Sequence, residues 1–321
     1  MQLVEIEDLH VSFSQHDGVV QAVRGVSFGL APGESLGIVG ESGSGKSVTC
    51  SALLRLLREP AARITAKTMT LGGNDVLKAN SRSMSNLRGR VAAMVFQDPM
   101  TSLDPVFTIG HQIAETIRTH RDVSKAEAMQ QAIHALKRVE IKNAAAVVRY
   151  YPHQLSGGML QRAMIAMALS CEPEVLIADE PTTALDVTIQ AQILQLIKDI
   201  QAETGMGLIM ITHDLGVVAE TVDRVVVMYG GKVMETGAVE AIFEAPLHPY
   251  TRALLNSIPG QTAGKQRLVE IPGSSPNPAH PPAGCPFHPR CPMASMECRQ
   301  IVPRLATVAG DRQVACLKVA A

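Results

Sequence analysis

Residues 40–47, with the sequence GESGSGKS, constrain the fold of this chain more than any other stretch. An apolar, strand-like run at 36–39 comes before them, and a helix-forming run at about 46–57 follows. Glycines allow the backbone to turn tightly, so that its N–H groups point inward at phosphate oxygens. The N-terminus of the following helix brings the positive end of its dipole to the same place. This strand–loop–helix order predicts an α/β fold with a phosphate-binding loop.

Two side chains of the loop suit phosphate and metal chemistry. Lys46 provides a mobile cation for the terminal phosphates of a nucleotide, and the Ser47 hydroxyl is a suitable Mg²⁺ ligand. The other loop residues expected to contact the nucleotide are Gly40, Ser42, Gly43, Ser44, Gly45 and Val48. Phe13 ends an earlier strand-like run and is a candidate for stacking on the base. A position in the core explains this aromatic residue equally well.

The composition of the 321-residue chain limits the other classes to which it can belong. Apolar residues make up 46% of it, which suffices for one sizeable core or two modest ones. There are 29 Lys plus Arg against 30 Asp plus Glu, so no basic excess indicates nucleic-acid binding. No stretch approaches about eighteen consecutive apolar residues, and no secretory signal is visible. We therefore expect a cytoplasmic chain that does not itself span a membrane.

The rest of the first 240 residues alternates between strand and helix patterns. Runs at 3–13 and 19–30, with a turn at 17–18, predict an antiparallel β subdomain at the N-terminus. Apolar residues recur at helical spacing between 109 and 139, which predicts a helical subdomain at about 100–165. Such an insertion between sheet strands is a typical place for a partner-specific surface.

Gln97 and His213 each come at the end of a short apolar run that is typical of a buried strand. Gln97 follows the run at 91–96 (VAAMVF), and His213 comes soon after the run at 207–211. Sheets of the α/β class bind ligands at the carboxyl ends of their strands. Gln97 is therefore a candidate for contacting Mg²⁺ or the attacking water, and His213 for hydrogen-bonding a terminal phosphate. The alternatives are a solvated loop glutamine and a surface histidine.

Asp179 and Glu180 end a third aliphatic run, VLIA at 175–178. Asp179 is placed to hold Mg²⁺ through its water shell, and Glu180 is placed to orient and polarise an attacking water. The alternative is a pair of acids that cap a loop. The phosphate loop expected in the same sheet favours the catalytic interpretation.

A second candidate anion site lies at residues 155–159, with the sequence LSGGM. Ser156, Gly157 and Gly158 head a helical run and offer a hydroxyl, unhindered N–H groups and a helix N-terminus. Met159 completes the motif. The chain contains one nucleotide-binding loop, so a second phosphate-binding helix end is unexpected in a monomer. A dimer explains it, because this helix end can then bind the nucleotide of the partner subunit.

Together these motifs resemble an ATP-binding cassette (ABC) transporter ATPase, over nearly the whole chain. GESGSGKS, Gln97, LSGGM, VLIADE, ALD and ITHD occur in that family's order and spacing. The finer resemblance is to ATPase subunits of bacterial dipeptide/oligopeptide importers. It depends on QDPMTSLDP (97–105), YPHQLSGGM (151–159), IADEPTTALDVTIQAQI (177–193) and HPYTRALL (248–255). The resemblance implies an ABC-type P-loop NTPase core at 1–240, followed by a small irregular C-terminal domain at 241–321.

The resemblance also implies partners and a location. Two ATPase subunits would sandwich two ATP molecules head to tail, so that Ser156, Gly157, Gly158 and Met159 contact the ATP of the partner. Asp186, in ALD, would belong to the segment called the D-loop in this family. The partner ATPase is usually a different, related chain, and two transmembrane permease subunits would dock on the helical subdomain. An extracellular substrate-binding protein would act indirectly, and this chain would be peripheral on the cytoplasmic face of the inner membrane.

The Pro-rich tail contains Cys285, Cys291, Cys298 and Cys316, spaced C-x5-C-x6-C-x17-C. Four thiols in a cytosolic chain favour metal over disulfides. Zinc sites usually contain short C-x2–4-C pairs, which are missing here, whereas iron–sulfur clusters tolerate wider spacings. Members of the peptide-importer family have similar tails that can carry a [4Fe–4S] cluster. A cluster with a structural or redox-sensing role is therefore expected, with zinc or plain thiols as alternatives. Cys50 and Cys171 lie in apolar surroundings and are expected to be buried and inert.

Two functional alternatives stay open. The leading hypothesis is an ATPase subunit that powers the import of short peptides, and an importer with nickel, glutathione or oligosaccharide as cargo is an alternative, because the ATPase need not touch the cargo. A non-transport ABC ATPase in DNA repair or translation fits less well, since the chain has one cassette, no heptad run and no basic patch.

Overall fold

The computed structural model describes residues 2–15, 18–183, 185–257 and 271–319, and the chain divides into two units. The first unit contains Ala31–Gly33 and Ala79–Ile209. The second contains Gln2–Leu30, Glu34–Lys78 and the described part of Met210–Ala321. The strand β9 (Gly207–Thr212) includes the boundary between the units.

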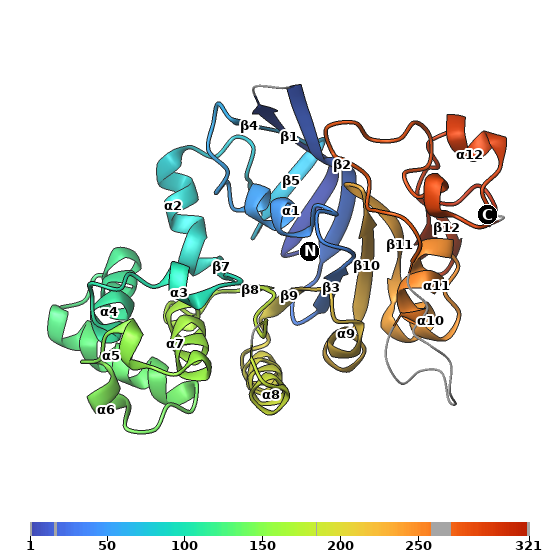
Figure 1. Cartoon of the computed structure of the whole chain (residues 1–321). Coiled ribbons are helices and arrows are strands. Elements are labelled where there is room, and N and C mark those ends of the chain that lie inside the picture. Colours follow the sequence, from blue (N-terminus) through green and yellow to red (C-terminus); the bar gives the residue numbers. More distant parts are fainter. Residues whose placement is uncertain (1, 16–17, 184, 258–270, 320–321) are drawn as a thin grey trace. The chain divides into compact units, whose positions relative to one another are not determined.

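The second unit begins with two long antiparallel strands, β1 (Val4–Gln15) and β2 (Gly18–Leu30), shown in dark blue in Figure 1. Val4 lies opposite Leu30 in the ladder. Alternate residues of β1 are buried, as the apolar pattern predicts, so the expected antiparallel subdomain is confirmed. Residue 17 of the predicted turn lies outside the described residues. The sheet order is β2-β1-β5-β6, with β4 also paired to β1; β4 is Ala62–Thr65, β5 Thr68–Leu71 and β6 Asn74–Asp75.

A second ladder in the same unit contains the strand that leads to the phosphate loop. This strand is β3 (Ser35–Val39), which is buried throughout and pairs in parallel with β10 (Arg224–Tyr229). A tight turn through Gly230 and Gly231 connects β10 to antiparallel β11 (Lys232–Ala238), as predicted for this hairpin. Near the C-terminus, β13 (Arg312–Val314) pairs with β11 and with β12 (Ala306–Ala309).

The helices of the second unit are short. They are α1 (Lys46–Leu53), α9 (Leu215–Thr221), α10 (Val239–Glu244), α11 (Pro249–Asn256), the 3₁₀ turn η2 (His288–Arg290) and α12 (Met296–Gln300). The prediction that the first helix extends to about residue 57 is wrong. It ends at Leu53 because Arg55 adopts a left-handed conformation with φ 47°, which cannot continue an α-helix.

The first unit is mainly helical. Its elements are α2 (Ser81–Arg90), β7 (Ala92–Val95), α3 (Pro99–Ser102), α4 (Ile109–His120), α5 (Lys125–Arg138), α6 (Ala144–Val147), the 3₁₀ turn η1 (Pro152–Gln154), α7 (Gly157–Leu169), β8 (Val175–Asp179) and α8 (Val187–Thr204). The helical spacing between 109 and 139 is confirmed by α4 and α5, which pack on each other and on α7 (Figure 1). Strands β7 and β8 are parallel, with Val95 opposite Ala178.

None of the helices within the described ranges is both long enough and apolar enough to cross a membrane.

Candidate functional site

The phosphate loop in the second unit depends on glycine at two positions. Gly40 has φ 148°, and a Cβ atom there would lie 2.1 Å from the carbonyl oxygen of Met228. Gly45 has φ 100°, and a Cβ atom there would lie 2.5 Å from the carbonyl oxygen of Ala22. Backbone atoms cannot move aside as a flexible side chain can. Only glycine therefore allows the loop to pass this close to β10 and β2 before it enters α1.

Polar groups line the same loop. The buried Lys46 donates hydrogen bonds from Nζ to the carbonyl oxygens of Gly40, at 2.7 Å, and of Glu41, at 3.1 Å. The hydroxyl of Ser44 is buried and has no hydrogen-bond partner within the described parts of the chain. Gly43 faces open space. A cation held at a glycine loop and a buried hydroxyl without a partner among the described residues fit a phosphate-bearing ligand.

The remaining predicted ligand residues of this unit lie at element ends. Ser47 and Val48 are half-buried in the first turn of α1. Phe13 is half-buried near the end of β1, opposite Val20 and Ala62 in the ladders. His213 is exposed and directly follows β9.

In the first unit the structure brings Gln97 and Glu180 together. Gln97 Nε2 donates a hydrogen bond to Glu180 Oε2 at 2.7 Å. The strand register explains this contact, because each residue lies two positions beyond the paired residues Val95 and Ala178. Thr183 Oγ1 donates a second hydrogen bond to Glu180 Oε2, at 2.9 Å.

The two acids at the end of β8 have different environments. Asp179 is 6% exposed and is the last residue of a strand that is buried throughout. Glu180 is half-buried and has φ 46°, an unusual conformation for a residue with a side chain. Such backbone conformations cluster at functional sites, where the surrounding structure holds them in place. The chain bends at Glu180, and the carboxylate lies beside Gln97.

The LSGGM motif forms the N-terminus of α7, as predicted. Ser156 is the exposed N-cap residue, and its Oγ accepts the Met159 N–H at 3.4 Å. Gly157 is exposed, and a Cβ atom at Gly158 would lie 2.9 Å from Ile189 Cγ2 in α8. The close approach of the two helices explains the second glycine.

Asp186 acts as the N-cap of α8, where its Oδ1 accepts the Ile189 N–H at 3.0 Å. The sequence did not predict this capping role. Ala184 of the same ALD motif lies outside the described residues.

The four tail cysteines gather in one region, but they do not form a recognisable metal site. The N–H of Cys285 donates to the carbonyl oxygen of Cys298 at 2.8 Å. Burial raises the pKa of Cys285 to about 11, and the charges of Cys291, Cys298 and Cys316 act in the same direction. Among the described residues, no three His, Cys, Asp or Glu side chains form a group that holds a metal ion. The described residues therefore give no support to the predicted iron–sulfur cluster. Cys50 and Cys171 are buried, as expected.

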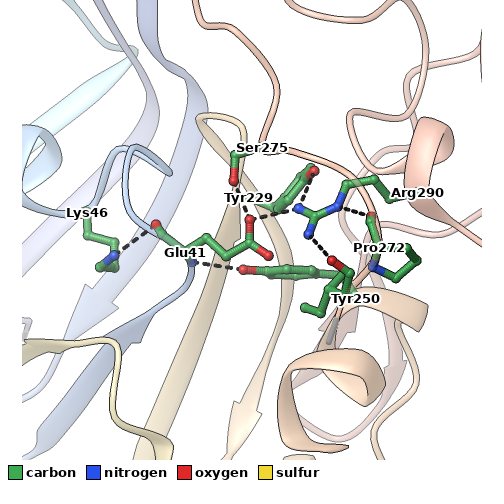
Figure 2. A network of polar contacts seen from close by, with 8 residues as sticks. Glu41, Lys46, Tyr229, Tyr250, Pro272, Ser275 and Arg290 are labelled. Carbon is green, nitrogen blue, oxygen red and sulfur yellow. Dashed lines mark hydrogen bonds and ion pairs between the residues drawn. The ribbon is translucent and has the colours of Figure 1, made fainter. Parts of the chain in front are cut away.

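Sequence reasoning missed a polar network between the phosphate loop and the C-terminal part of the second unit (Figure 2). It links Glu41 of the loop to Arg290, Tyr250 and Ser275. Tyr250 belongs to the HPY triplet at 248–250, for which the family motif alone predicts no role. No local pattern assigns Arg290 a partner 249 positions away.

A buried parallel strand, a glycine loop that enters a helix, and two acids at the end of another buried parallel strand define a phosphate-loop ATPase. The model of the family described as "ABC transporter" matches residues 23–183, and that of "Oligopeptide/dipeptide transporter, C-terminal region" matches residues 234–298. The chain belongs to the ABC transporter family and is an ATPase.

Two full-length relatives and one solved structure illustrate the similarity. The "Probable peptide ABC transporter ATP-binding protein y4tR" of Sinorhizobium fredii is 50% identical over 98% of this chain and 94% of its own length. The "Dipeptide transport ATP-binding protein DppD" of Escherichia coli is 47% identical over 98% of this chain and 96% of its own length. The dimeric ATP-binding cassette MJ0796 in a post-hydrolysis state with ADP and phosphate has a TM-score of 0.63 and 26% identity. That comparison covers 74% of this chain and 98% of the cassette. These comparisons confirm the predicted ABC ATPase fold.

Proposed function

We propose that this chain is the ATP-hydrolysing subunit of an importer that moves short peptides across the cytoplasmic membrane. One observation carries the proposal: the chain is similar over 98% of its length to proteins named for peptide and dipeptide transport. Residues 234–298 also match the family described as "Oligopeptide/dipeptide transporter, C-terminal region". We propose accordingly an ABC ATPase domain at 1–240, with a helical subdomain at about 100–165, and a C-terminal domain at 241–321.

At the nucleotide we propose the following roles. Lys46 and the loop N–H groups bind the phosphates, and Phe13 stacks on the base. Ser47, Asp179 and Gln97 would hold Mg²⁺, which would supply charge neutralisation at the phosphates. The support from the structure is the glycine-dependent loop, the buried Lys46 and the buried Ser44 hydroxyl, which has no hydrogen-bond partner among the residues that the structure describes.

For hydrolysis, Glu180 is the proposed general base. Its Oε2 accepts hydrogen bonds from Gln97 and Thr183, and these two bonds hold the carboxylate in one orientation. A carboxylate in this setting accepts the proton of a water as that water attacks the terminal phosphate. His213, exposed after β9, is the proposed hydrogen-bond donor to that phosphate.

We further propose a head-to-tail dimer with a second ABC ATPase subunit, two transmembrane permeases and an extracellular binding protein. The exposed Ser156 and Gly157 at the N-terminus of α7 support the dimer, because this helix end is open to a ligand of another chain. Asp186 would lie near the same interface. Gel filtration of the two ATPases with and without ATP tests the dimer, which should form only when ATP is present. Association to the same extent with and without ATP would contradict this proposal. The chain would then lie at the cytoplasmic face of the membrane.

Uptake in cells that lack this chain tests the function and the cargo together. Restoring the wild-type chain should restore uptake of a labelled dipeptide, whereas Lys46→Ala should leave uptake at the background level, because the loop loses its phosphate-binding cation. Lys78→Ala is the matched control: Lys78 is 86% exposed and pairs only with the nearby Asp75 among the contacts described. If the wild-type chain restored uptake of glutathione, nickel or an oligosaccharide but not of the dipeptide, that compound would become the proposed cargo in place of peptides. Restoration of none would contradict a transport function.

An iron–sulfur cluster on Cys285, Cys291, Cys298 and Cys316 stays a separate prediction from the sequence. Its support is the presence of four thiols in the last 37 residues of the sequence, although the described residues do not form a metal site. Protein purified without oxygen should contain about four iron and four sulfide per chain, and Cys291→Ser should remove them. Cys171→Ser, at a buried cysteine outside the tail, should not. Colourless wild-type protein without iron or sulfide would show that the thiols carry no cluster.

A further inference from the structure

Glu41, the second residue of the phosphate loop, is held by the C-terminal part of the same unit (Figure 2). Its Oε2 accepts a hydrogen bond from Arg290 Nη1 at 2.8 Å and another from the Ser275 hydroxyl. Its backbone N–H donates to the phenol oxygen of Tyr250 at 2.9 Å. Both the side chain and the backbone of one loop residue are therefore fixed from outside the loop.

The guanidinium of Arg290 is itself fixed on every side. Nε donates to the carbonyl oxygen of Pro272 at 2.9 Å, and Nη2 donates to that of Ile271 at 3.0 Å. Nη1 also donates to the phenol oxygen of Tyr229 at 3.1 Å, and the guanidinium lies 5.7 Å from the centre of that ring. The side chain is 7% exposed. A planar fork held by so many partners presents a cation to Glu41 in one orientation.

Tyr250 gives a second, uncharged support. The residue is fully buried in α11, and its ring packs against Tyr229 with 4.6 Å between the ring centres. Burial raises the pKa of Tyr250, so the phenol stays neutral at physiological pH. Its oxygen accepts the Glu41 N–H without adding a charge beside the loop.

The charge of Glu41 needs compensation if the loop binds phosphates. A carboxylate in a loop that binds a polyphosphate repels the ligand unless a cation neutralises it. The backbone of Glu41 is also linked to the binding machinery, because its carbonyl oxygen accepts a hydrogen bond from Lys46 Nζ at 3.1 Å. The position and the charge of Glu41 therefore both affect how the loop receives phosphate.

We propose that Arg290 is a positioning residue of the phosphate loop, which neutralises Glu41 and holds it so that the C-terminal segment sets the affinity for nucleotide. This inference rests on the proposed function, in which the loop binds the phosphates of ATP. Arg290 acts through Glu41 and does not touch the nucleotide.

Binding of ADP, measured by calorimetry on the full chain, tests the proposal. Arg290→Met should weaken binding at least about tenfold, the scale of one lost charge-assisted hydrogen bond. Adding Glu41→Gln to this variant should restore affinity to within about threefold of wild type, because the uncompensated charge is gone. Arg252→Met is the matched control: this exposed arginine of α11 donates to the carbonyl oxygen of Pro246 and has no described contact with the loop. It should bind ADP like wild type.

Each outcome decides the proposal. Unchanged binding by Arg290→Met overturns it, and so does a double variant that binds no better than Arg290→Met. Should Arg290→Met fail to fold, Arg290→Lys keeps the charge but loses the fork geometry. If Arg290 acts by neutralising Glu41, the Arg290→Lys variant should bind ADP with an affinity within about threefold of wild type. A larger loss of affinity would overturn the proposal. Wild-type protein that binds neither ADP nor ATP would instead contradict the proposed function.

Discussion

The Glu180→Gln variant should bind ATP normally but hydrolyse it at least about 100-fold more slowly than the wild type. Glutamine has nearly the same shape as glutamate, and its amide oxygen can still accept the hydrogen bonds from Gln97 Nε2 and Thr183 Oγ1. It cannot accept a proton from water. The geometry therefore persists while the proposed general base is lost.

Phosphate release and equilibrium ATP binding, measured on the same preparation, separate these two effects. Glu172→Gln is the matched control, because Glu172 also has a left-handed backbone, with φ 53°, and its side chain is 70% exposed and pairs with Arg121. Its hydrolysis should equal that of wild type. Wild-type turnover by Glu180→Gln would remove Glu180 from the proposed catalytic role.

The largest loss of stability is expected at Glu235, which lies in β11 of the second unit. Replacing it with alanine should lower the free energy of unfolding by about 3–5 kcal/mol, the usual effect of breaking a buried ion pair from one side. Glu235 is fully buried, and its Oε1 accepts a hydrogen bond from Arg312 Nη2 at 2.7 Å. The N–H groups of Leu247 and His248 donate to its two oxygens at 2.9 Å each. The variant leaves a cation and two N–H groups without their acceptor.

Thermal unfolding followed by circular dichroism measures this loss, which corresponds to roughly 6–20 °C in Tm. Glu240→Ala, at an exposed acid in the first turn of α10, is the control and should change stability by no more than about 0.5 kcal/mol. Adding Arg312→Leu to Glu235→Ala should recover part of the loss by removing the unpaired charge. A Glu235→Ala variant as stable as wild type would contradict the importance of this buried network.

His248, whose N–H donates to Glu235, has a structural role within the HPY triplet. Burial lowers the pKa of His248 to about 4, so its ring is neutral at pH 7. The neutral Nδ1 accepts a hydrogen bond from the Tyr250 N–H at 3.0 Å, so His248 is the N-cap residue of α11. This cap places Tyr250, whose hydroxyl reaches Glu41 of the phosphate loop. The triplet therefore connects the network around Glu235 to the loop.

The sequence by itself determined the features that depend on short stretches. Three features follow from local spacing and side-chain type: the glycine loop, the strands that end shortly before Gln97 and Glu180, and the helix that follows Ser156. The contact between Gln97 and Glu180 did not follow from the sequence alone, because it depends on the pairing and register of β7 and β8. The early end of α1 did not follow, since the left-handed conformation of Arg55 has no marker in residue type.

Only the tertiary structure decided what the C-terminal region does to the loop. Glu41 occupies a variable position of its motif, and Arg290, 249 residues later, lies among prolines and cysteines with no periodic pattern. The same holds for Glu235 and Arg312, which are 77 residues apart. Residue pairs of this kind come into contact through the packing of strands and loops that are far apart in the sequence. Local sequence periodicity does not predict such contacts. Likewise, four cysteines predict thiol chemistry, but spacing alone does not decide whether their sulfurs converge on a metal.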